Sequence, residues 1–300
     1  MINFTLVILL ILSLVIFKLV YHQISYYFEH YQSQINQISQ SSKTNMWIYW
    51  DNINSNQKPG IIELCHQSFA KHCSYNFNIH LLNSENINHL LPELDEYRLN
   101  LSGLKICHKV DIYRLFLLYK YGGIYIDSDI LVMKNLDLVK NKLKYFDFVG
   151  FGCSFKNSKN YGYSKPSNWL MASRVRGILM KNCILDIINR KTLLPVNYHD
   201  IGKKLIWNQL NNMIQNDKYE YYHFNYHFDG TWDSYGNWVT SKISYSNKPI
   251  QYHTETKNNM VVFAPIYFNS LTIDQKKMTR KQILDSDTNI GYYCRKSGLS

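Results

Sequence analysis

The sequence predicts an α/β fold that opens with a parallel βαβ unit and is preceded by an apolar N-terminal segment. Three observations support this prediction. From residue 46 onward, strand-like segments alternate with helix-like segments, which is typical of βαβ units. A helical stripe ends at two glycines, and a short apolar run follows them. Hydrophobic residues make up 46% of the 300 positions, which is enough for one substantial core.

Residues 2–20 form an apolar run with one charge, Lys18, near its far end. A helix of that length can just span a bilayer. A cleaved signal peptide would begin with basic residues and be followed by small ones, and neither is present. A retained signal anchor over residues 1–21 is therefore favoured over a cleaved signal or a core helix. Residues 22–45, rich in Gln and Ser, predict a polar stalk, and residues 46–300 predict the folded domain.

The anchor predicts a single-pass membrane protein. The only N-glycosylation acceptor outside the anchor, at Asn100, favours a secretory route. We therefore expect the folded domain to lie in the lumen of an endomembrane compartment such as the ER or Golgi. The flanking charges leave the orientation open, because no Lys or Arg precedes the apolar run.

The formal net charge of +11 and the isoelectric point near 9.2 favour an anionic partner. Nucleic acid, an anionic membrane surface and a nucleotide-linked substrate all qualify. Because Lys and Arg are scattered and form no known nucleic-acid-binding pattern, we expect no nucleic-acid partner. The six cysteines lack CxxC spacing, which argues against zinc. Disulfides, with Cys65 and Cys73 the nearest pair in sequence, and buried free thiols both remain open.

The predicted elements follow in order along the chain. An aromatic run that ends at Trp50 predicts the first strand, and nucleotides bind at the carboxyl ends of such strands, so Trp50 is a site candidate. Asp111 and Arg114 lie three residues apart and share a face of a predicted helix. The predicted strands are 46–50, 77–82, 124–126 and runs within 147–152 and 168–173, and the predicted helices are 59–75, 105–120, 177–189 and 201–214.

Asp127 and Asp129 directly follow the predicted strand 124–126, separated only by Ser128. In an extended segment, residues i and i+2 point to the same side and lie roughly 7 Å apart. Their repulsion is about 0.6 kcal/mol in water and several-fold larger in a partly desolvated cleft. Mn²⁺ and Mg²⁺ bind through one or two such carboxylates together with substrate phosphates. The pair therefore predicts a divalent metal site, with a solvated acidic turn as the alternative.

The segment KVDIYRLFLLYKYGGIYIDSDILV, residues 109–132, resembles the hallmark segment of glycosyltransferases with the DXD sugar-binding motif. That group includes glycosyltransferase family 32 and capsular polysaccharide synthesis proteins. Fainter similarity extends to IYW, SNWLMAS and HFDGTW, so the resemblance covers most of residues 46–235. It implies a GT-A (Rossmann-like) nucleotide-diphospho-sugar transferase fold and retention of the anomeric configuration.

The resemblance also implies a role for individual residues. Trp50 would pack against the nucleotide base, Asp111 and Arg114 would bind the donor sugar and its diphosphate, and His227 would join the two aspartates as a metal ligand. The residues implied to bind substrate are Trp50, Asp111, Arg114, Tyr125, Ser128, Asn168 and Trp232, and those implied to hold the metal are Asp127, Asp129 and His227. Two positions depart from the family pattern: Thr231 stands where serine is usual, and one histidine is present where the family commonly has two.

These observations predict a membrane-anchored, metal-dependent hexosyltransferase. The donor would be a nucleotide-diphosphate sugar, and the acceptor a hydroxyl of a glycan, a lipid or a protein. A non-catalytic sugar-binding protein is one alternative, because every ligand named could bind without reacting. A haloacid dehalogenase-like phosphatase is a second, because such enzymes also carry two aspartates after an apolar strand. In those phosphatases, however, the motif follows the first strand, whereas here at least two strands precede it.

Overall fold

The computed structural model describes residues 15–18, 42–52, 57–97, 99–152, 165–190, 192–194, 197–224, 239–250 and 263–300. The chain divides into two units, residues 1–42 and 43–300. In the first unit, residues 15–18 are helical, and the rest of the expected anchor lies outside the described residues. No helix among the residues that the structure describes is both long and apolar enough to cross a bilayer.

A six-stranded mixed sheet forms the centre of the second unit, in the order β2-β1-β3-β6-β5-β7. β1 pairs in parallel with β2 and β3, and this confirms the predicted βαβ unit. β6 is antiparallel to both β3 and β5, a reversal that the sequence did not predict. The strands are β1 (Thr44–Tyr49), β2 (Phe77–Leu82), β3 (Gly123–Ile126), β5 (Phe148–Phe151), β6 (Ser167–Ser173) and β7 (Tyr222–His223).

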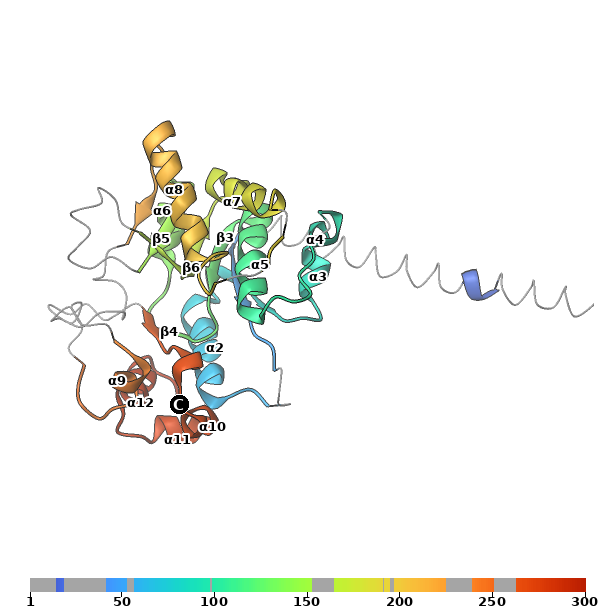
Figure 1. The fold of residues 1–300 in the computed structure, drawn as a ribbon. Helices are drawn as coiled ribbons and strands as arrows, with labels where there is room; N and C mark the ends of the chain where they lie inside the picture. The colour runs from blue at the N-terminus through green and yellow to red at the C-terminus, as the bar shows by residue number, and fades with distance from the viewer. Residues whose placement is uncertain are drawn as a thin grey trace, which may run out of the picture. The chain divides into compact units, whose positions relative to one another are not determined.

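Helices cover both faces of this sheet. Ile48 and Ile126 share a buried cluster with the apolar side of α2 (Gly60–Cys73). Tyr49 and Tyr125 point to the other face, where they contact α5 (Ile106–Tyr121). This alternation follows from the two-residue period of a strand. In Figure 1, α7 (Ile178–Ile188) lies beside α5, α8 (Lys203–Asp217) lies beside α7, and the C-terminal helices gather around α2.

Two glycines make the tight connection from α5 into the central strand β3. Gly122 ends the helix with φ of +64°, and Gly123 follows with φ of +98°. A Cβ at Gly123 would lie 2.2 Å from the Asn45 carbonyl oxygen of β1, so only glycine fits between the neighbouring strands. The helix stop predicted at these glycines is confirmed.

A two-stranded antiparallel sheet joins the segment after the acidic pair to the C-terminal part of the chain. It consists of β4 (Ile130–Val132) and β8 (Phe263–Pro265), and the Ile266 N–H donates to the Asp129 carbonyl at 2.9 Å. The sequence analysis predicted neither strand. The remaining elements are α3 (Ile87–Leu90), α4 (Glu93–Glu96), α6 (Asp137–Lys142), α9 (Ser241–Ser244), η3 (Phe268–Ser270), α10 (Ile273–Lys277), α11 (Arg280–Leu284) and α12 (Asn289–Lys296).

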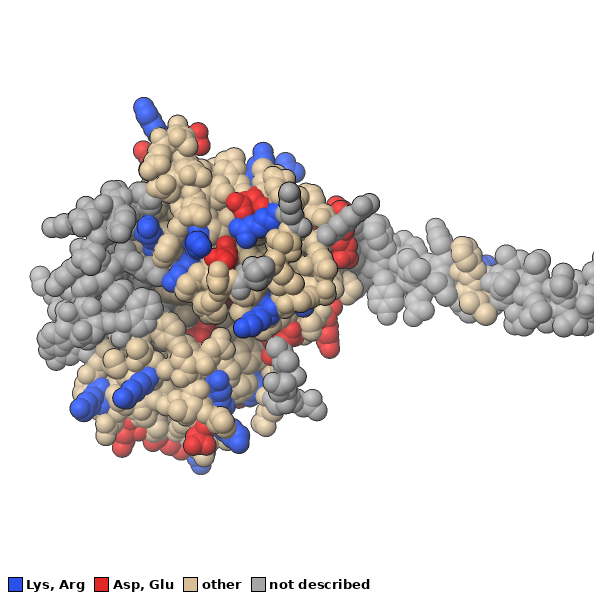
Figure 2. Space-filling model, in the orientation of Figure 1, with Lys and Arg blue, Asp and Glu red and all other residues tan. Residues whose placement is uncertain are grey.

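Charge is dispersed over the described part of the face that Figure 2 shows. On the coloured part of the face in Figure 2, Lys and Arg are scattered among acidic and uncharged side chains. The cysteines of the described residues are free thiols, and Cys65 and Cys73 do not form the disulfide left open by the sequence. Burial raises the pKa of the Cys73 thiol to about 12, which makes it unreactive at neutral pH.

Candidate active site

The acidic pair lies where the parallel strands β1 and β3 end. The Asp127 N–H donates to the Trp169 carbonyl of β6 at 2.8 Å and so extends the β3–β6 ladder by one residue. The Ser128 hydroxyl donates to the Tyr49 carbonyl of β1 at 2.7 Å. Two neighbouring strands therefore hold the turn. Because the buried Ser128 side chain faces backbone, its expected contact with substrate stays a prediction.

Arg114 organises the site from α5. Its guanidinium lies 3.2 Å from carboxylate oxygens of both Asp111 and Asp127, and it also donates to the backbone carbonyls of Val110 and Asn168. The guanidinium carbon is 4.5 Å from the centre of the Tyr125 ring. The arginine is only 5% exposed. Its charge-assisted contacts link α5, β3 and β6.

Asn168 and Gly202 complete the contacts of Asp111. The Asn168 side-chain amide donates to Asp111 Oδ1 at 2.7 Å. A Cβ at Gly202 would lie 2.5 Å from Asn168 Nδ2 and 2.7 Å from Asp111 Oδ2, so the turn that begins α8 packs directly on this pair. Burial raises the pKa of Asp111, while Arg114, His108 and Asn168 lower it in part.

The surroundings of Asp127 and Asp129 disfavour the charged form of both carboxyl groups. Burial raises the pKa of Asp127 to about 7; Arg114 opposes this shift, whereas Asp129 and Asp111 add to it. Burial also raises the pKa of Asp129, against the hydrogen bond from the Phe268 amide. Arg114 forms ion pairs with Asp111 and Asp127, and Asp129 adds a third carboxylate nearby. The excess negative charge favours binding of a cation.

The donor atoms fit a hard divalent cation. Within the described part of the chain, no group donates a hydrogen bond to Asp127 Oδ2, and the Asp129 carboxylate accepts only from backbone amides, although the two residues are partly desolvated. Mn²⁺ or Mg²⁺ would take these oxygens and complete its shell with water and phosphate. Among the described residues, no three or more His, Cys, Asp or Glu side chains form a metal site. The expected third ligand, His227, and the expected substrate contact Trp232 lie outside the described residues.

Trp50 lies beside the acidic pair and is joined to it through Phe268. The half-buried indole donates to Asn52 Oδ1 at 2.7 Å, and its ring meets the edge of Phe268 with centroids 5.2 Å apart. The Phe268 amide in turn donates to Asp129 Oδ2 at 2.8 Å. The preceding Tyr267 has φ of +55°, a left-handed conformation that is rare for a residue with a side chain and frequent at functional sites.

One protein family matches nearly the whole chain, including the acidic pair. The model of one protein family, described as capsular polysaccharide synthesis protein, matches residues 12–293. The chain belongs to this family. The match confirms the resemblance drawn from residues 109–132 and identifies the chain as a glycosyltransferase. It stands against the haloacid dehalogenase-like phosphatase, as does the position of the acidic pair after the third strand of the chain.

Three solved structures show limited similarity to the glycosyltransferase. The PaToxG glycosyltransferase matches at 13% identity and a TM-score of 0.42, over 65% of this chain and 80% of its own. GlyE of Streptococcus pneumoniae TIGR4 matches at 12% identity and 0.41, over 87% and 61% respectively. The galactosyltransferase LgtC, in complex with donor and acceptor sugar analogs, matches at 12% identity and 0.44, over 85% and 95%. No curated protein matches the chain.

Sequence reasoning missed three residues that the structure brings to the site: Tyr198, Gly202 and Phe268. Tyr198 is 64% exposed; partial burial raises the pKa of its phenol, and the negative charges of nearby groups, Asp127 foremost, raise it further. None of the three belongs to the DXD segment, and Phe268 lies 139 residues from Asp129. The only sequence signal for any of these three residues was the predicted start of a helix near Gly202. That signal does not reveal a contact with Asp111.

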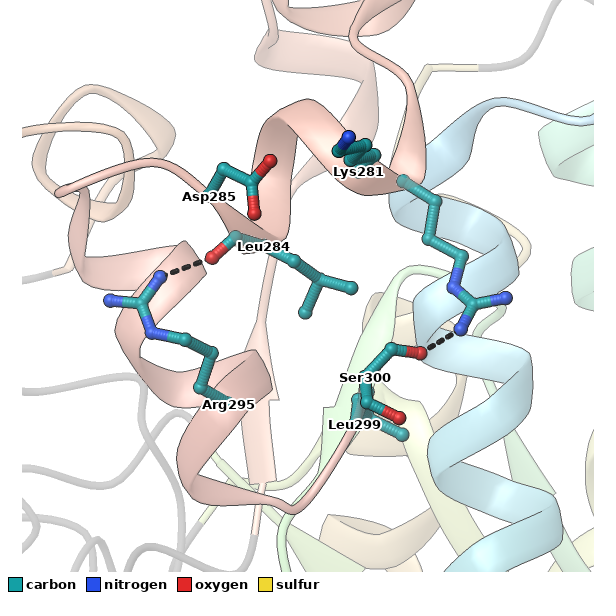
Figure 3. Close-up of a pocket in the computed structure, with 7 residues that line it drawn as sticks. Lys281, Leu284, Asp285, Arg295, Leu299 and Ser300 are labelled. Atoms are coloured by element: carbon teal, nitrogen blue, oxygen red, sulfur yellow. Dashed lines mark hydrogen bonds between the residues drawn. The ribbon is translucent and has the colours of Figure 1, made fainter.

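A separate hollow of about 510 Å³ lies among α11, α12 and the last residues of the chain. Figure 3 shows Arg295 reaching the Leu284 carbonyl across it, and Leu299 on its wall. A second arginine, Arg280, donates to the Ser300 carbonyl. This hollow shares no lining residue with the acidic site, and both arginines already have backbone partners.

Proposed function

We propose that this glycosyltransferase transfers a hexose from a nucleotide-diphosphate sugar to a hydroxyl group of a glycan, a lipid or a protein. The reaction would use Mn²⁺ or Mg²⁺, proceed on a GT-A-type fold and retain the anomeric configuration. One observation carries the proposal: Asp127 and Asp129 converge with Trp50 and the Arg114 cluster at the edge of the sheet where β1 and β3 end. Ligands of α/β proteins bind at such an edge.

The chain's own groups would divide the work. Asp127 and Asp129 offer the oxygens for the cation, which when bound would neutralise charge on the departing diphosphate. Trp50 offers a flat ring for the nucleotide base. Arg114 holds Asp127 in place, and its four protein contacts favour this positioning role over direct binding of the diphosphate. Tyr198 lies at the exposed rim, where a sugar would enter.

The membrane anchor is part of the proposal and rests on the sequence of residues 2–20. A single-pass protein with its folded domain in an endomembrane lumen would sediment with membranes and resist protease until detergent is added. Release of the untreated protein into the soluble fraction would contradict the anchor without touching the proposed chemistry.

The decisive experiment is hydrolysis of a panel of nucleotide-diphosphate sugars by the metal-stripped protein, with and without added Mn²⁺. We expect release of nucleoside diphosphate only with the metal. The double variant Asp127→Asn/Asp129→Asn should lose at least about 1000-fold in rate, because it removes the ligands that stabilise the leaving group. Asp186→Asn is the matched control and should keep its activity, because Asp186 lies on α7 and is paired with Arg190.

Circular dichroism of the double variant separates loss of chemistry from loss of fold. Full activity in a folded Asp127→Asn/Asp129→Asn protein would end the proposal. Metal-dependent binding of a donor without any release of product would instead identify the non-catalytic sugar-binding protein.

A further inference from the structure

One exposed aromatic ring lies on the turn that leads into α8. Tyr198 is 64% exposed, whereas Ile201 in the same turn is buried. Gly202 follows, and a Cβ there would lie 2.7 Å from Asp111 Oδ2. The last residues of the turn therefore pack on the acidic cluster, while the Tyr198 side chain remains open to solvent.

Hydrogen bonds fix the backbone of this turn. Asp200 Oδ2 accepts from the Asn197 N–H at 3.1 Å and from the Asn197 side-chain amide at 3.0 Å. The Asp200 N–H donates to the Asn197 carbonyl at 3.0 Å, and the Lys204 N–H donates to the His199 carbonyl at 3.1 Å. These contacts lie on both sides of Tyr198 along the chain. Because they order its backbone in advance, a ligand that binds to Tyr198 incurs a smaller entropy cost.

The Tyr198 side chain contacts one neighbouring ring. It meets His199 in an edge-to-face arrangement, with ring centroids 4.8 Å apart and ring planes at 70°. In the described part of the chain, no group forms a hydrogen bond with the Tyr198 hydroxyl. The fold thus holds the backbone of this residue and leaves most of its ring unused.

Tyr198 lies close enough to the acidic cluster for the carboxylate charges to act on it. Partial burial raises the pKa of its phenol most, and the negative charges of Asp127, Asp111 and Asp129 raise the pKa further. The packing of Gly202 on Asp111 ties the same turn to the Asp111 side of the cluster. Electrostatics and packing therefore agree on where the exposed ring lies.

The site has an aromatic residue at each end. Trp50, the proposed contact of the nucleotide base, joins the cluster on the Asp129 side. Tyr198 joins it on the Asp111 side. A nucleotide-diphosphate sugar has its base at one end, its sugar at the other and the diphosphate between them. With the base on Trp50 and the diphosphate at the acidic pair, the sugar would reach the end that carries Tyr198.

We propose that Tyr198 recognises the sugar of the donor by stacking its ring on the apolar face of the hexose. The C–H groups on one face of a hexose can pack on an aromatic ring, which offers a large apolar surface at a fixed position. This inference rests on the proposed function and adds the residue that distinguishes the sugar-bearing donor from the free nucleoside diphosphate.

The test compares ligands that differ only in the sugar: UDP with UDP-glucose, UDP-galactose and UDP-N-acetylglucosamine, and GDP with GDP-mannose. Calorimetry with Mn²⁺ measures their Kd for the wild type, Tyr198→Ala and Tyr198→Phe. For the sugar nucleotide that the wild type binds, we expect Tyr198→Ala to weaken binding about tenfold. Binding of the corresponding nucleoside diphosphate should change by less than about twofold. Tyr198→Phe keeps the ring and should stay within about threefold of the wild type for both ligands.

Tyr145→Ala is the matched control. Tyr145 is 77% exposed and precedes β5. Because β3 and β5 are both antiparallel to β6, the amino end of β5 lies at the sheet edge opposite the acidic pair. This variant should leave every affinity unchanged.

Circular dichroism of Tyr198→Ala checks that the variant is folded. Equal losses for the sugar nucleotide and the nucleoside diphosphate, or no loss for either, would overturn the stacking contact and leave the proposed function in place. A loss in Tyr198→Phe as large as that in Tyr198→Ala would do the same. Sugar-selective loss without release of product from any donor supports the contact and contradicts sugar transfer. A wild type that binds none of the probes contradicts both.

Discussion

Single residues decide the geometry of the acidic cluster. Asp111 and Arg114, spaced three apart, would form an ordinary surface pair worth a few tenths of a kcal/mol on an isolated helix. Here both are buried, and Arg114 also bridges to Asp127. Removing one partner of such a buried pair typically costs about 3–5 kcal/mol, because the other charge is left uncompensated. The cluster is therefore held as a unit, and its packing against Gly202 matters as much as its charges.

Gly202→Ala should disturb this unit without removing any polar group. The added Cβ would meet Asn168 Nδ2 at 2.5 Å and Asp111 Oδ2 at 2.7 Å, and neither atom can move freely. We expect donor hydrolysis to fall at least about tenfold, because small misplacements of site residues have large effects on rate. Gly103→Ala is the control, since its Cβ would meet only the mobile end of the Leu194 side chain. Equal rates for the two variants would show that Gly202 does not position the site.

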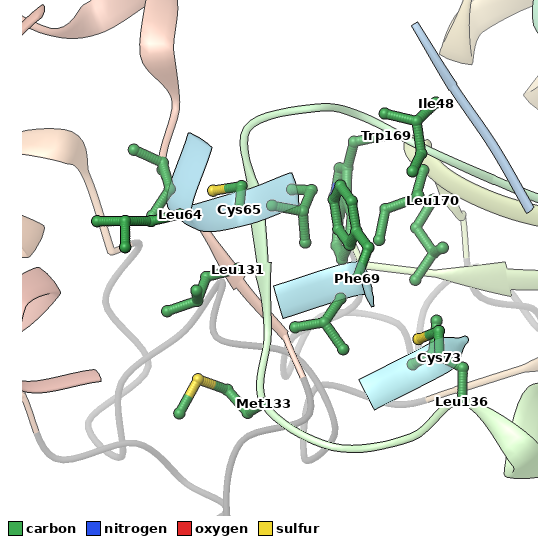
Figure 4. Close-up of a cluster of buried hydrophobic side chains, with 14 of the residues drawn as sticks. Ile48, Leu64, Cys65, Phe69, Cys73, Leu131, Met133, Leu136, Trp169 and Leu170 are labelled. Atoms are coloured by element: carbon green, nitrogen blue, oxygen red, sulfur yellow. The ribbon is translucent and has the colours of Figure 1, made fainter. Parts of the chain in front are cut away.

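At the scale of elements, α2 is the link between the sheet and the C-terminal helices. Figure 4 shows Leu64, Cys65 and Phe69 of α2 in one buried cluster with Leu131 of β4 and Leu170 of β6. Burial of each large apolar side chain contributes about 1.5–3 kcal/mol. The first residue of α2, Gly60, packs against the backbone that leads into α11. The C-terminal part that supplies Phe268 to the site is thus anchored on this helix.

Gly60→Ala should loosen that anchor. Its Cβ would lie 2.4 Å from the Arg280 nitrogen and 2.7 Å from the Met278 carbonyl oxygen, both backbone atoms. Overpacking of this kind costs about 1–3 kcal/mol, which exceeds the gain of up to about 1 kcal/mol from the better helix propensity of alanine. Urea unfolding measures the change. Gln67→Ala on the same helix should stay within about 0.5 kcal/mol of wild type, and a Gly60→Ala protein of wild-type stability would refute the contact.

At the scale of the whole molecule, partly buried neutral histidines link stability to pH. Burial lowers the pKa of His80 to about 4 and that of His223 to about 4 as well. His80 stacks on Trp47 and hydrogen-bonds Asn45 at 3.0 Å. A depressed histidine pKa contributes stability that is present above the unfolded value near 6.5 and is lost as pH falls toward about 4.

His80→Gln should remove part of this pH dependence. The difference in unfolding free energy between wild type and variant should shrink by on the order of 1–3 kcal/mol as pH falls from about 7 to about 4. Asp127, whose raised pKa acts in the opposite direction over this range, is common to both proteins and cancels in the difference. Denaturant titrations at several pH values provide the measurement, with the exposed His199→Gln as control. A difference that is constant with pH would contradict a neutral buried His80.

The sequence by itself determined the strands, helices and glycine stop that lead to Asp127 and Asp129, because these depend on local period and on short motifs. It also determined the family, since residues 109–132 form one continuous pattern. Only the tertiary structure decided that β6 runs antiparallel to β3, that Arg114 serves Asp111 and Asp127 together, and that Phe268 and Gly202 adjoin the site. These features join segments far apart in the chain, and such contacts arise from packing, on which a local pattern carries no information.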